Sequence, residues 1–214
     1  MVKLVIFDWD GTLFDSIDKI CLSMLQAGEL ANAPSRQTDD VKNIIGLSLD
    51  KAVSVIWPEL NKNECDAIVE HYKYLYRAAD QTPPKAYDGV MAVLEKLHSA
   101  NIKMAVATGK SRKGLDRVMT ATKTGHYFSS TRCADETLSK PHPLMLEQIL
   151  TELSLSPDQA IMVGDTEYDL NMATNAGMKS IGVTYGAHSK ARLEALQPYG
   201  LLNNFNQLTT ILGL

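Results

Sequence analysis

The stretch LVIFDWDGTLFDS, residues 4–16, places two aspartates directly after four apolar residues and directly before a Gly-Thr pair. A short, continuous apolar run is typical of a strand in a parallel sheet that is covered on both faces. The two aspartates are Asp8 and Asp10. Burying like charges beside such a strand costs several kcal/mol unless a cation compensates them. We therefore expect this strand to end at a functional site.

Similar apolar runs recur later in the chain. They lie at residues 102–108, 160–165 and 179–186, with a weaker one near 127–134. Segments with apolar residues at helical spacing separate these runs from residue 86 onward. This alternation predicts an α/β fold with a doubly wound parallel sheet.

The part of the chain between the first strand and residue 82 has a different pattern. It shows no convincing strand, and its apolar residues recur at helical spacing in two stripes. We expect an inserted helical cap over residues 15–83. The α/β catalytic core is then made of residues 1–14 and 84–214.

The composition excludes several classes of protein. The 214 residues fit one core with an inserted subdomain, and the apolar fraction of 45% is ordinary for a globular protein. The formal net charge of −4 provides no general field to attract nucleic acid or an anionic membrane. No apolar segment resembles a signal peptide or reaches the length of a membrane span. We expect a cytoplasmic protein without nucleic-acid or membrane partners, and the oligomeric state stays open.

Polar residues follow three of the expected strands. Ligands of open α/β sheets bind beyond the carboxyl ends of the strands, so residues at these ends are expected to meet. The residues concerned are Asp8, Asp10, Thr108, Gly109, Gly164, Asp165 and Asp169. Carboxylates gathered in one crevice favour a hard divalent cation, and Mg²⁺ suits a site that also holds phosphate oxygens. Lys140, between Ser139 and Pro141, could reach the same crevice and balance the carboxylates.

Four short motifs resemble those of the haloacid dehalogenase superfamily. DWDGT at residues 8–12 is similar to the first motif, Thr108 in VATGK to the second, Lys140 to the third, and GDTEYD at residues 164–169 to the fourth. They occur in the family's order, and the resemblance extends over essentially the whole chain. The stretches ATGKSRKGLDRVM, GVTYGAH and IIGLSLDKAV are most similar to the phosphoglycolate phosphatase-like branch.

The resemblance implies a role for each acidic motif residue. Asp8 would attack phosphorus and form an aspartyl phosphate, while Asp10 would act as general acid and then as general base. Mg²⁺ would be held by the carboxylates of Asp8 and Asp165 and by the backbone carbonyl of Asp10. Asp169 would support the metal through water or orient Lys140.

The resemblance also implies which residues bind the substrate. The candidates are Thr108, Gly109, Lys140, Gly46 and Ser48. Lys110 is a further candidate on different grounds, since it belongs to a short basic stretch beside the expected site. Thr108, the Gly109 amide and Lys140 would hold the non-reacting phosphate oxygens and stabilise charge in the transition state. Gly46 and Ser48 lie in a cap loop that would close over the site.

Together these features imply a Mg²⁺-dependent phosphatase that hydrolyses a small phosphorylated metabolite, such as a phosphoglycolate-like phosphomonoester. Asp10 argues against dehalogenase or phosphonatase chemistry, because the leaving groups of those reactions need no such acid. Three alternatives stay open. They are phosphoryl transfer on a sugar phosphate like that of β-phosphoglucomutase, a pyrophosphatase or nucleotidase of the same superfamily, and a non-catalytic binding module that keeps the fold.

Overall fold

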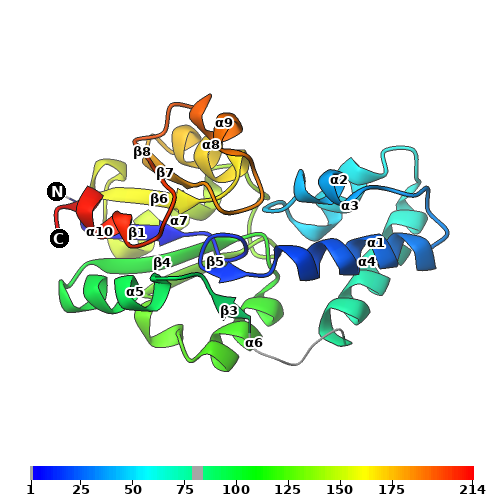
Figure 1. Ribbon diagram of the computed structural model, residues 1–214, viewed down its shortest axis with the longest axis horizontal. Helices are drawn as coiled ribbons and strands as arrows, with labels where there is room; N and C mark the ends of the chain where they lie inside the picture. Colours follow the sequence, from blue (N-terminus) through cyan, green and yellow to red (C-terminus); the bar gives the residue numbers. More distant parts are fainter. Residues whose placement is uncertain (1, 79–83) are drawn as a thin grey trace.

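The computed structural model describes residues 2–78 and 84–214 (Figure 1). Its central element is a six-stranded sheet in the order β5-β4-β1-β6-β7-β8, in which all neighbouring strands are parallel. The strands are β1 (Leu4–Phe7), β4 (Lys103–Thr108), β5 (Ser130–Cys133), β6 (Ala160–Gly164), β7 (Lys179–Val183) and β8 (Gly200–Leu202). The predicted parallel sheet is therefore confirmed.

Helices cover both faces of this sheet. Successive residues of a strand point to opposite faces, so each strand packs against both layers of helices. Phe7 of β1 belongs to the same apolar cluster as Leu94 on one face, and Ile6 packs with Ile149 on the other. The helices involved are α5 (Val90–Ser99), α6 (Arg112–Thr122), α7 (Leu144–Leu153), α8 (Glu167–Asn175), α9 (Lys190–Glu194) and α10 (Gln207–Leu212), with short 3-10 helices at Gly125–Tyr127 and Pro157–Gln159. Burial on both faces explains the continuous apolar sequences of the strands and confirms the doubly wound architecture.

The register of the central strands brings their carboxyl ends to one edge. Phe7 of β1 lies level with Val106 of β4 and with Val163 of β6. The polar residues that follow these positions therefore emerge side by side. This edge faces the helices drawn on the right of Figure 1.

β7 is shorter than the apolar run expected at residues 179–186, since it ends at Val183. The chain leaves the sheet there and approaches Asp165. A Cβ atom on Gly186 would lie 2.1 Å from the Cβ of Asp165, so this close approach requires glycine.

Four helices between β1 and α5 share a separate apolar cluster. They are α1 (Ile17–Leu30), α2 (Thr38–Lys42), α3 (Leu49–Ile56) and α4 (Lys62–Ala78), and they lie beyond the carboxyl ends of the strands (Figure 1). Met24, Trp57 and Ile68 are buried in this cluster. Trp57 packs directly on Gly28 of α1, where an added Cβ would lie 2.5 Å from the indole ring. Within the described residues, no helix has the length and apolar character needed to cross a bilayer.

The chain passes to these four helices and back through a two-stranded antiparallel ribbon. β2 (Phe14–Asp15) pairs with β3 (Lys85–Ala86), with Phe14 opposite Ala86 and Asp15 opposite Lys85. The division into a core and a cap at residues 14 and 84 stays a prediction. Residues 1 and 79–83 of the predicted domains lie outside the described residues.

Candidate active site

Three carboxylates meet at the carboxyl edge of the sheet. Asp8 follows β1, Asp165 follows β6, and Asp169 lies in the first turn of α8. One oxygen of each lies within 4.8 Å of the others, and the three side chains are buried. Parallel strands thus assemble this acidic group from segments that are far apart in the sequence.

Lys140 is the cation buried with this group. Its Nζ lies 2.9 Å from Oδ1 of Asp8 and 2.7 Å from Oδ1 of Asp169, and the side chain is 1% exposed. Burial opposes the charged form of Lys140, but Asp169 and Asp8 outweigh it and raise the pKa of the ammonium above its ordinary value. The predicted meeting of Lys140 with the carboxylates is therefore observed.

The acidic group still carries more negative charge than Lys140 balances. Burial raises the pKa of Asp8 well above its ordinary value, with Lys140 opposing the shift and neighbouring carboxylates adding to it. Burial and Asp169 raise the pKa of Asp165 to about 7. Among the described residues Oδ2 of Asp8 is buried and has no hydrogen-bond partner. A divalent cation with oxygen ligands would relieve both the charge and the unpartnered oxygen.

Asp165 is held in a cradle of small residues. Oδ1 accepts a hydrogen bond of 2.8 Å from Oγ1 of Thr12, and Oδ2 accepts one of 2.8 Å from the backbone N–H of Ala187. A Cβ on Gly11 would lie 2.2 Å from Oδ2, and Gly11 has a φ of +76°. The Gly-Thr pair of the opening stretch therefore fixes Asp165 as well as the turn after β1.

Asp10 is not a member of the three-carboxylate group and has other partners. Its Oδ1 accepts a hydrogen bond from Oγ of Ser16 and lies 2.9 Å from Nζ of Lys110. Lys110 in turn donates to the hydroxyl of Tyr76 on α4 over 3.3 Å. Burial lowers the pKa of Lys110, but Asp10 and Tyr76 outweigh it and raise that pKa overall. The sequence indicated Lys110 but gave no signal for Tyr76, because its spacing also fits an ordinary apolar helix stripe.

Residues 46–48 lie directly over the end of β4. A Cβ on Gly109 would lie 2.6 Å from the carbonyl oxygen of Leu47 and 2.8 Å from that of Gly46, so only glycine fits here. The backbone N–H of Ser48 donates a 2.9 Å hydrogen bond to Oγ of Ser139, next to Lys140. Thr108 itself is fully buried beneath this contact.

A cavity of about 790 Å³ opens at this edge. The predicted site residues that line it are Asp8, Asp10, Gly46, Ser48, Gly109 and Lys110. Thr108, Lys140, Asp165 and Asp169 do not line it; they lie behind Asp8 and Gly109 in the buried part of the site. The structure therefore brings all ten predicted residues into one region but exposes only part of them to a ligand.

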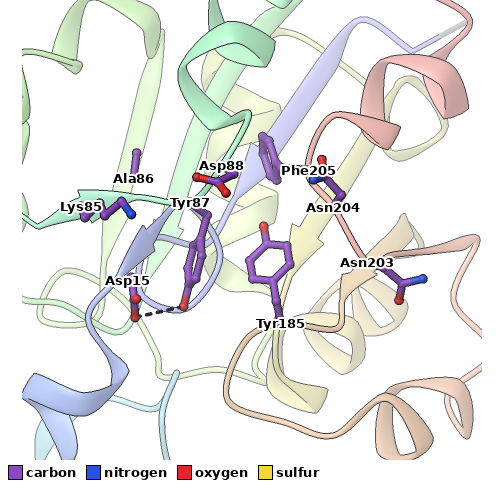
Figure 2. A pocket seen from close by; sticks show the side chains of 9 residues that line it. All are labelled: Asp15, Lys85, Ala86, Tyr87, Asp88, Tyr185, Asn203, Asn204 and Phe205. Carbon is purple, nitrogen blue, oxygen red and sulfur yellow. Dashed lines mark hydrogen bonds between the residues drawn. The ribbon is translucent and has the colours of Figure 1, made fainter.

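A second cavity, of about 250 Å³, lies beside the β2–β3 ribbon and contains none of the predicted site residues (Figure 2). The ring centroids of Tyr87 and Tyr185 lie 4.5 Å apart there, and the hydroxyl of Tyr87 donates to Oδ1 of Asp15 over 3.4 Å. The hydroxyl of Tyr185 donates to the backbone oxygen of Thr12 over 2.8 Å. These contacts connect the ribbon to the loop that cradles Asp165.

Comparison with known proteins identifies the family. The profile described as haloacid dehalogenase-like hydrolase matches residues 5–183. The "Probable phosphatase IndB" of Dickeya dadantii is 32% identical over 97% of this chain and 92% of its own length. A "Phosphoglycolate phosphatase" of Vibrio cholerae is 31% identical over 86% and 85%, and a "Pyrophosphatase PpaX" of Anoxybacillus flavithermus is 28% identical over 99% and 97%.

Solved structures agree with this result. The crystal structure of a predicted phosphoglycolate phosphatase from Haemophilus somnus superposes with a TM-score of 0.89 and 26% identity, over 99% of this chain and 98% of that one. A β-phosphoglucomutase from Clostridium difficile shares the fold, with a TM-score of 0.84 and 19% identity, over 97% of this chain and 93% of that one. The chain is therefore an enzyme of the haloacid dehalogenase-like hydrolase family.

Proposed function

We propose that this protein is a Mg²⁺-dependent phosphatase that hydrolyses an organic phosphomonoester through an aspartyl phosphate on Asp8. The observation that carries the proposal is the buried, unpartnered Oδ2 of Asp8, in a carboxylate whose other oxygen lies 2.9 Å from Lys140. A nucleophilic oxygen needs a free lone pair. Lys140 opposes the burial that raises the pKa of Asp8, and a bound divalent cation would favour the ionised carboxylate further. The phosphatases named among the relatives support the same activity.

The donor set of the site fits the metal. We propose that Asp8 and Asp165 bind Mg²⁺ through their carboxylates and Asp10 through its backbone carbonyl, while Asp169 orients Lys140. Mg²⁺ prefers oxygen ligands and sites that also hold phosphate. When bound, Mg²⁺ would neutralise charge on the phosphate oxygens and on the attacking carboxylate.

Asp8 and Asp10 divide the bond-forming and proton-transfer steps. A carboxylate oxygen of Asp8 forms a bond to phosphorus while the bond from phosphorus to the leaving oxygen breaks, and Asp10 donates its proton to that oxygen. Asp10 then accepts a proton from water as the water oxygen attacks phosphorus, which frees Asp8 and releases inorganic phosphate. Ser16 and Lys110 hold the carboxylate of Asp10 in place for both steps.

The remaining predicted residues would position the substrate. The amide of Gly109, which lines the cavity, would bind a non-reacting phosphate oxygen. Thr108 and Lys140 are buried at the cavity floor behind Asp8 and Gly109, and we propose that they bind the phosphate oxygens that come closest to Asp8. Lys110, Gly46 and Ser48 would contact the rest of the substrate, since they line the cavity. In this proposal residues 15–83 act as the cap that excludes water, and the remainder of the chain is the catalytic core.

The size of the cavity and the apolar part of its lining support an organic substrate. Its volume of about 790 Å³ falls within the ~300–1,000 Å³ typical of sites for organic ligands. Its walls include the apolar and aromatic side chains of Ile20, Met24, Ile45, Leu49, Tyr72 and Tyr76. Such walls would stabilise a carbon-containing leaving group. The cationic side chains that also line the cavity, among them Lys73, Arg77 and Arg117, would attract any anionic substrate, including pyrophosphate. Because of the apolar walls, we favour a small organic phosphomonoester.

A substrate panel with one variant tests the proposal. Release of inorganic phosphate is measured with Mg²⁺ from phosphoglycolate, sugar phosphates, nucleoside monophosphates, p-nitrophenyl phosphate and pyrophosphate. We expect turnover of at least one phosphomonoester, no turnover by Asp8→Asn, and unchanged turnover by the exposed control Asp158→Asn. Full activity of Asp8→Asn would overturn the mechanism. Conversion of a sugar phosphate without release of phosphate would instead indicate a mutase.

A further inference from the structure

The segment of residues 44–48, here called the 44–48 loop, contacts three parts of the catalytic edge. The carbonyl oxygens of Gly46 and Leu47 lie so close to Gly109 that they leave no room for a Cβ atom there, and the N–H of Ser48 donates to Oγ of Ser139. On its other side a Cβ on Gly46 would lie 3.1 Å from Oγ1 of Thr166, next to Asp165. The whole loop lines the cavity. Its position therefore decides how much space a substrate has.

The start of this loop is fastened by Asn43, the residue that ends α2. The backbone oxygen of Asn43 accepts a 2.8 Å hydrogen bond from the hydroxyl of Tyr168. Its side-chain Oδ1 accepts a 2.7 Å hydrogen bond from Nη1 of Arg192. Tyr168 lies on α8 and Arg192 on α9, so two helices that pack on the main sheet hold one residue of the α1–α4 block.

Both donors are themselves fixed. Arg192 forms a two-pronged ion pair with Glu167, in which Nε donates over 2.7 Å to Oε2 and Nη2 donates to Oε1. The ring of Tyr168 packs edge-on against His188, with centroids 5.5 Å apart. The backbone N–H of His188 donates to the backbone oxygen of Asp165 over 3.3 Å. A short chain of contacts thus leads from Asn43 to the proposed metal ligand.

We propose that Asn43, Tyr168 and Arg192 form a clamp that holds the 44–48 loop over the catalytic edge and thereby sets the affinity for the substrate's leaving group. All three are positioning residues, because none of them lines the cavity. The loop is fastened at both ends, by the clamp before residue 44 and by Ser139 at residue 48. The kinetic part of this inference rests on the phosphatase activity proposed above, whereas its structural part does not.

Loss of the clamp is expected to act on binding more than on chemistry. Without the Asn43 side chain, a smaller fraction of molecules holds the 44–48 loop over the end of β4, here called the closed arrangement. The apparent affinity for the substrate falls in proportion to that fraction. Hydrogen bonds to charged groups are stronger than neutral ones, so an effect of about ten-fold is reasonable for the Arg192 contact. Saturating substrate would restore the closed arrangement. KM is then expected to rise about ten-fold while kcat changes less than about three-fold.

The experiment compares Asn43→Leu with Asn43→Asp, which keeps an acceptor oxygen for Arg192. Tyr168→Phe removes only the contact to the backbone oxygen of Asn43, whereas Arg192→Met removes the contact to Asn43 Oδ1 together with the ion pair to Glu167. These two variants replace Asn43→Leu if that variant does not fold. Arg132→Met is the matched control, because Arg132 also forms an ion pair, 2.8 Å to Glu152, but lies on β5 outside the cavity. Two kinds of measurement are made on the full chain: steady-state kinetics, which give kcat and KM for p-nitrophenyl phosphate with Mg²⁺, and amide hydrogen exchange across residues 44–48.

We expect faster exchange in the 44–48 loop and a raised KM for Asn43→Leu, and values near those of the wild type for Asn43→Asp and Arg132→Met. Wild-type exchange in Asn43→Leu, Arg192→Met and Tyr168→Phe would overturn the clamp, whatever their activity. Faster loop exchange in a protein that hydrolyses no phosphoester would support the clamp and reject the phosphatase. Faster exchange with an unchanged KM would overturn the claim that the clamp sets affinity.

Discussion

At the scale of single residues, Gly109 shows how closely the 44–48 loop approaches the end of β4. In Gly109→Ala the new methyl would meet two backbone carbonyl oxygens at 2.6 and 2.8 Å, and backbone cannot move aside as a flexible side chain can. We expect a loss of about 1–3 kcal/mol in the free energy of unfolding, as for other overpacked sites, together with a raised KM. Urea unfolding and steady-state kinetics measure both effects.

Gly125→Ala is the control for this substitution, because nothing lies within 4 Å of the position of its added Cβ. Its stability and its KM are expected to match those of the wild type. Equal stability of Gly109→Ala and Gly125→Ala would contradict the close contact at residue 109.

His188 predicts a dependence of stability on pH. Burial, followed by the charge of Arg192, lowers the pKa of this histidine below 6.5, while Glu167 opposes the shift. The folded protein therefore disfavours the proton that the unfolded chain takes up. The contribution of His188 to stability is complete above pH 6.5 and is lost as the pH falls from there through the lower folded pKa.

At about pH 5.5, one pH unit below the pKa of the unfolded chain, protonation of His188 can lower the free energy of unfolding by at most about 1.4 kcal/mol. The variant His188→Asn cannot titrate and keeps an acceptor for the N–H of Glu167, which His188 accepts at Nδ1 over 3.1 Å. We expect the free energy of unfolding to fall less between pH 7.5 and 5.5 in this variant than in the wild type. If the free energy of unfolding fell equally with pH in both proteins, His188 would not be the source of the pH dependence.

The sequence predicts which residues meet at the edge of the sheet, but not where each side chain points. Asp8 and Asp10 stand two positions apart, yet Asp10 turns toward Lys110 while Asp169 joins the three-carboxylate group. The alternation of a strand ends at Phe7, so it cannot orient residues in the turn that follows. The contact of Asn43 with Arg192 joins residues 149 positions apart, and no local pattern indicates it.

At the scale of elements, the packing of α1 on Trp57 gives a test of the second apolar cluster. Gly28→Ala would normally stabilise a helix by up to about 1 kcal/mol. Here the new methyl would lie 2.5 Å from the indole, which is 1% exposed and held by a 2.7 Å hydrogen bond from Nε1 to the oxygen of Pro34. We therefore expect a net loss of about 1–3 kcal/mol in urea unfolding.

Gly114→Ala in α6 is the matched comparison, since the nearest atom to its added Cβ is Oγ of Ser111 at 3.3 Å. This substitution is expected to be neutral or to stabilise by up to about 1 kcal/mol. A stabilising effect of Gly28→Ala would show that Trp57 can move and that the contact is not tight.

Strands were predictable where they are long and buried on both sides. The runs around β1, β4, β6 and β7 are continuous because helices cover both faces of the sheet. β8 has only the three residues Gly200–Leu202, and β2 and β3 have two each, which is too short for any periodic pattern. The pairing of β2 with β3 depends on where the intervening helices return the chain, and this is a property of packing rather than of local sequence.

At the scale of the whole molecule, the acidic group links stability to metal. If Mg²⁺ binds the folded chain only, a concentration of about 100 times its dissociation constant stabilises by about 2.7 kcal/mol. For a chain of this length such a gain raises the Tm by about 5–10 °C. We expect this shift in thermal unfolding of the metal-free protein at about pH 7.5, where neutral salt is the control.

Asp165→Asn is expected to abolish the shift, because it removes one of the two proposed carboxylate ligands, whereas the exposed substitution Asp158→Asn is expected to keep it. A Tm that rises equally in both variants would place the metal elsewhere.

The ribbon of β2 and β3 has a consequence for how such an enzyme diversifies. The chain leaves the sheet at Asp15 and returns at Lys85, its direct neighbour in the antiparallel pair. Opposed residues of such a pair lie only about 4.5–5.5 Å apart, a gap that a tight hairpin turn can close. The helices between them can therefore be exchanged, lengthened or deleted in a lineage without altering the strand order. Such an exchange would leave the carboxylates of Asp8 and Asp165 in place, but a new segment would have to supply again the contacts that Ser16 makes with Asp10 and Tyr76 makes with Lys110.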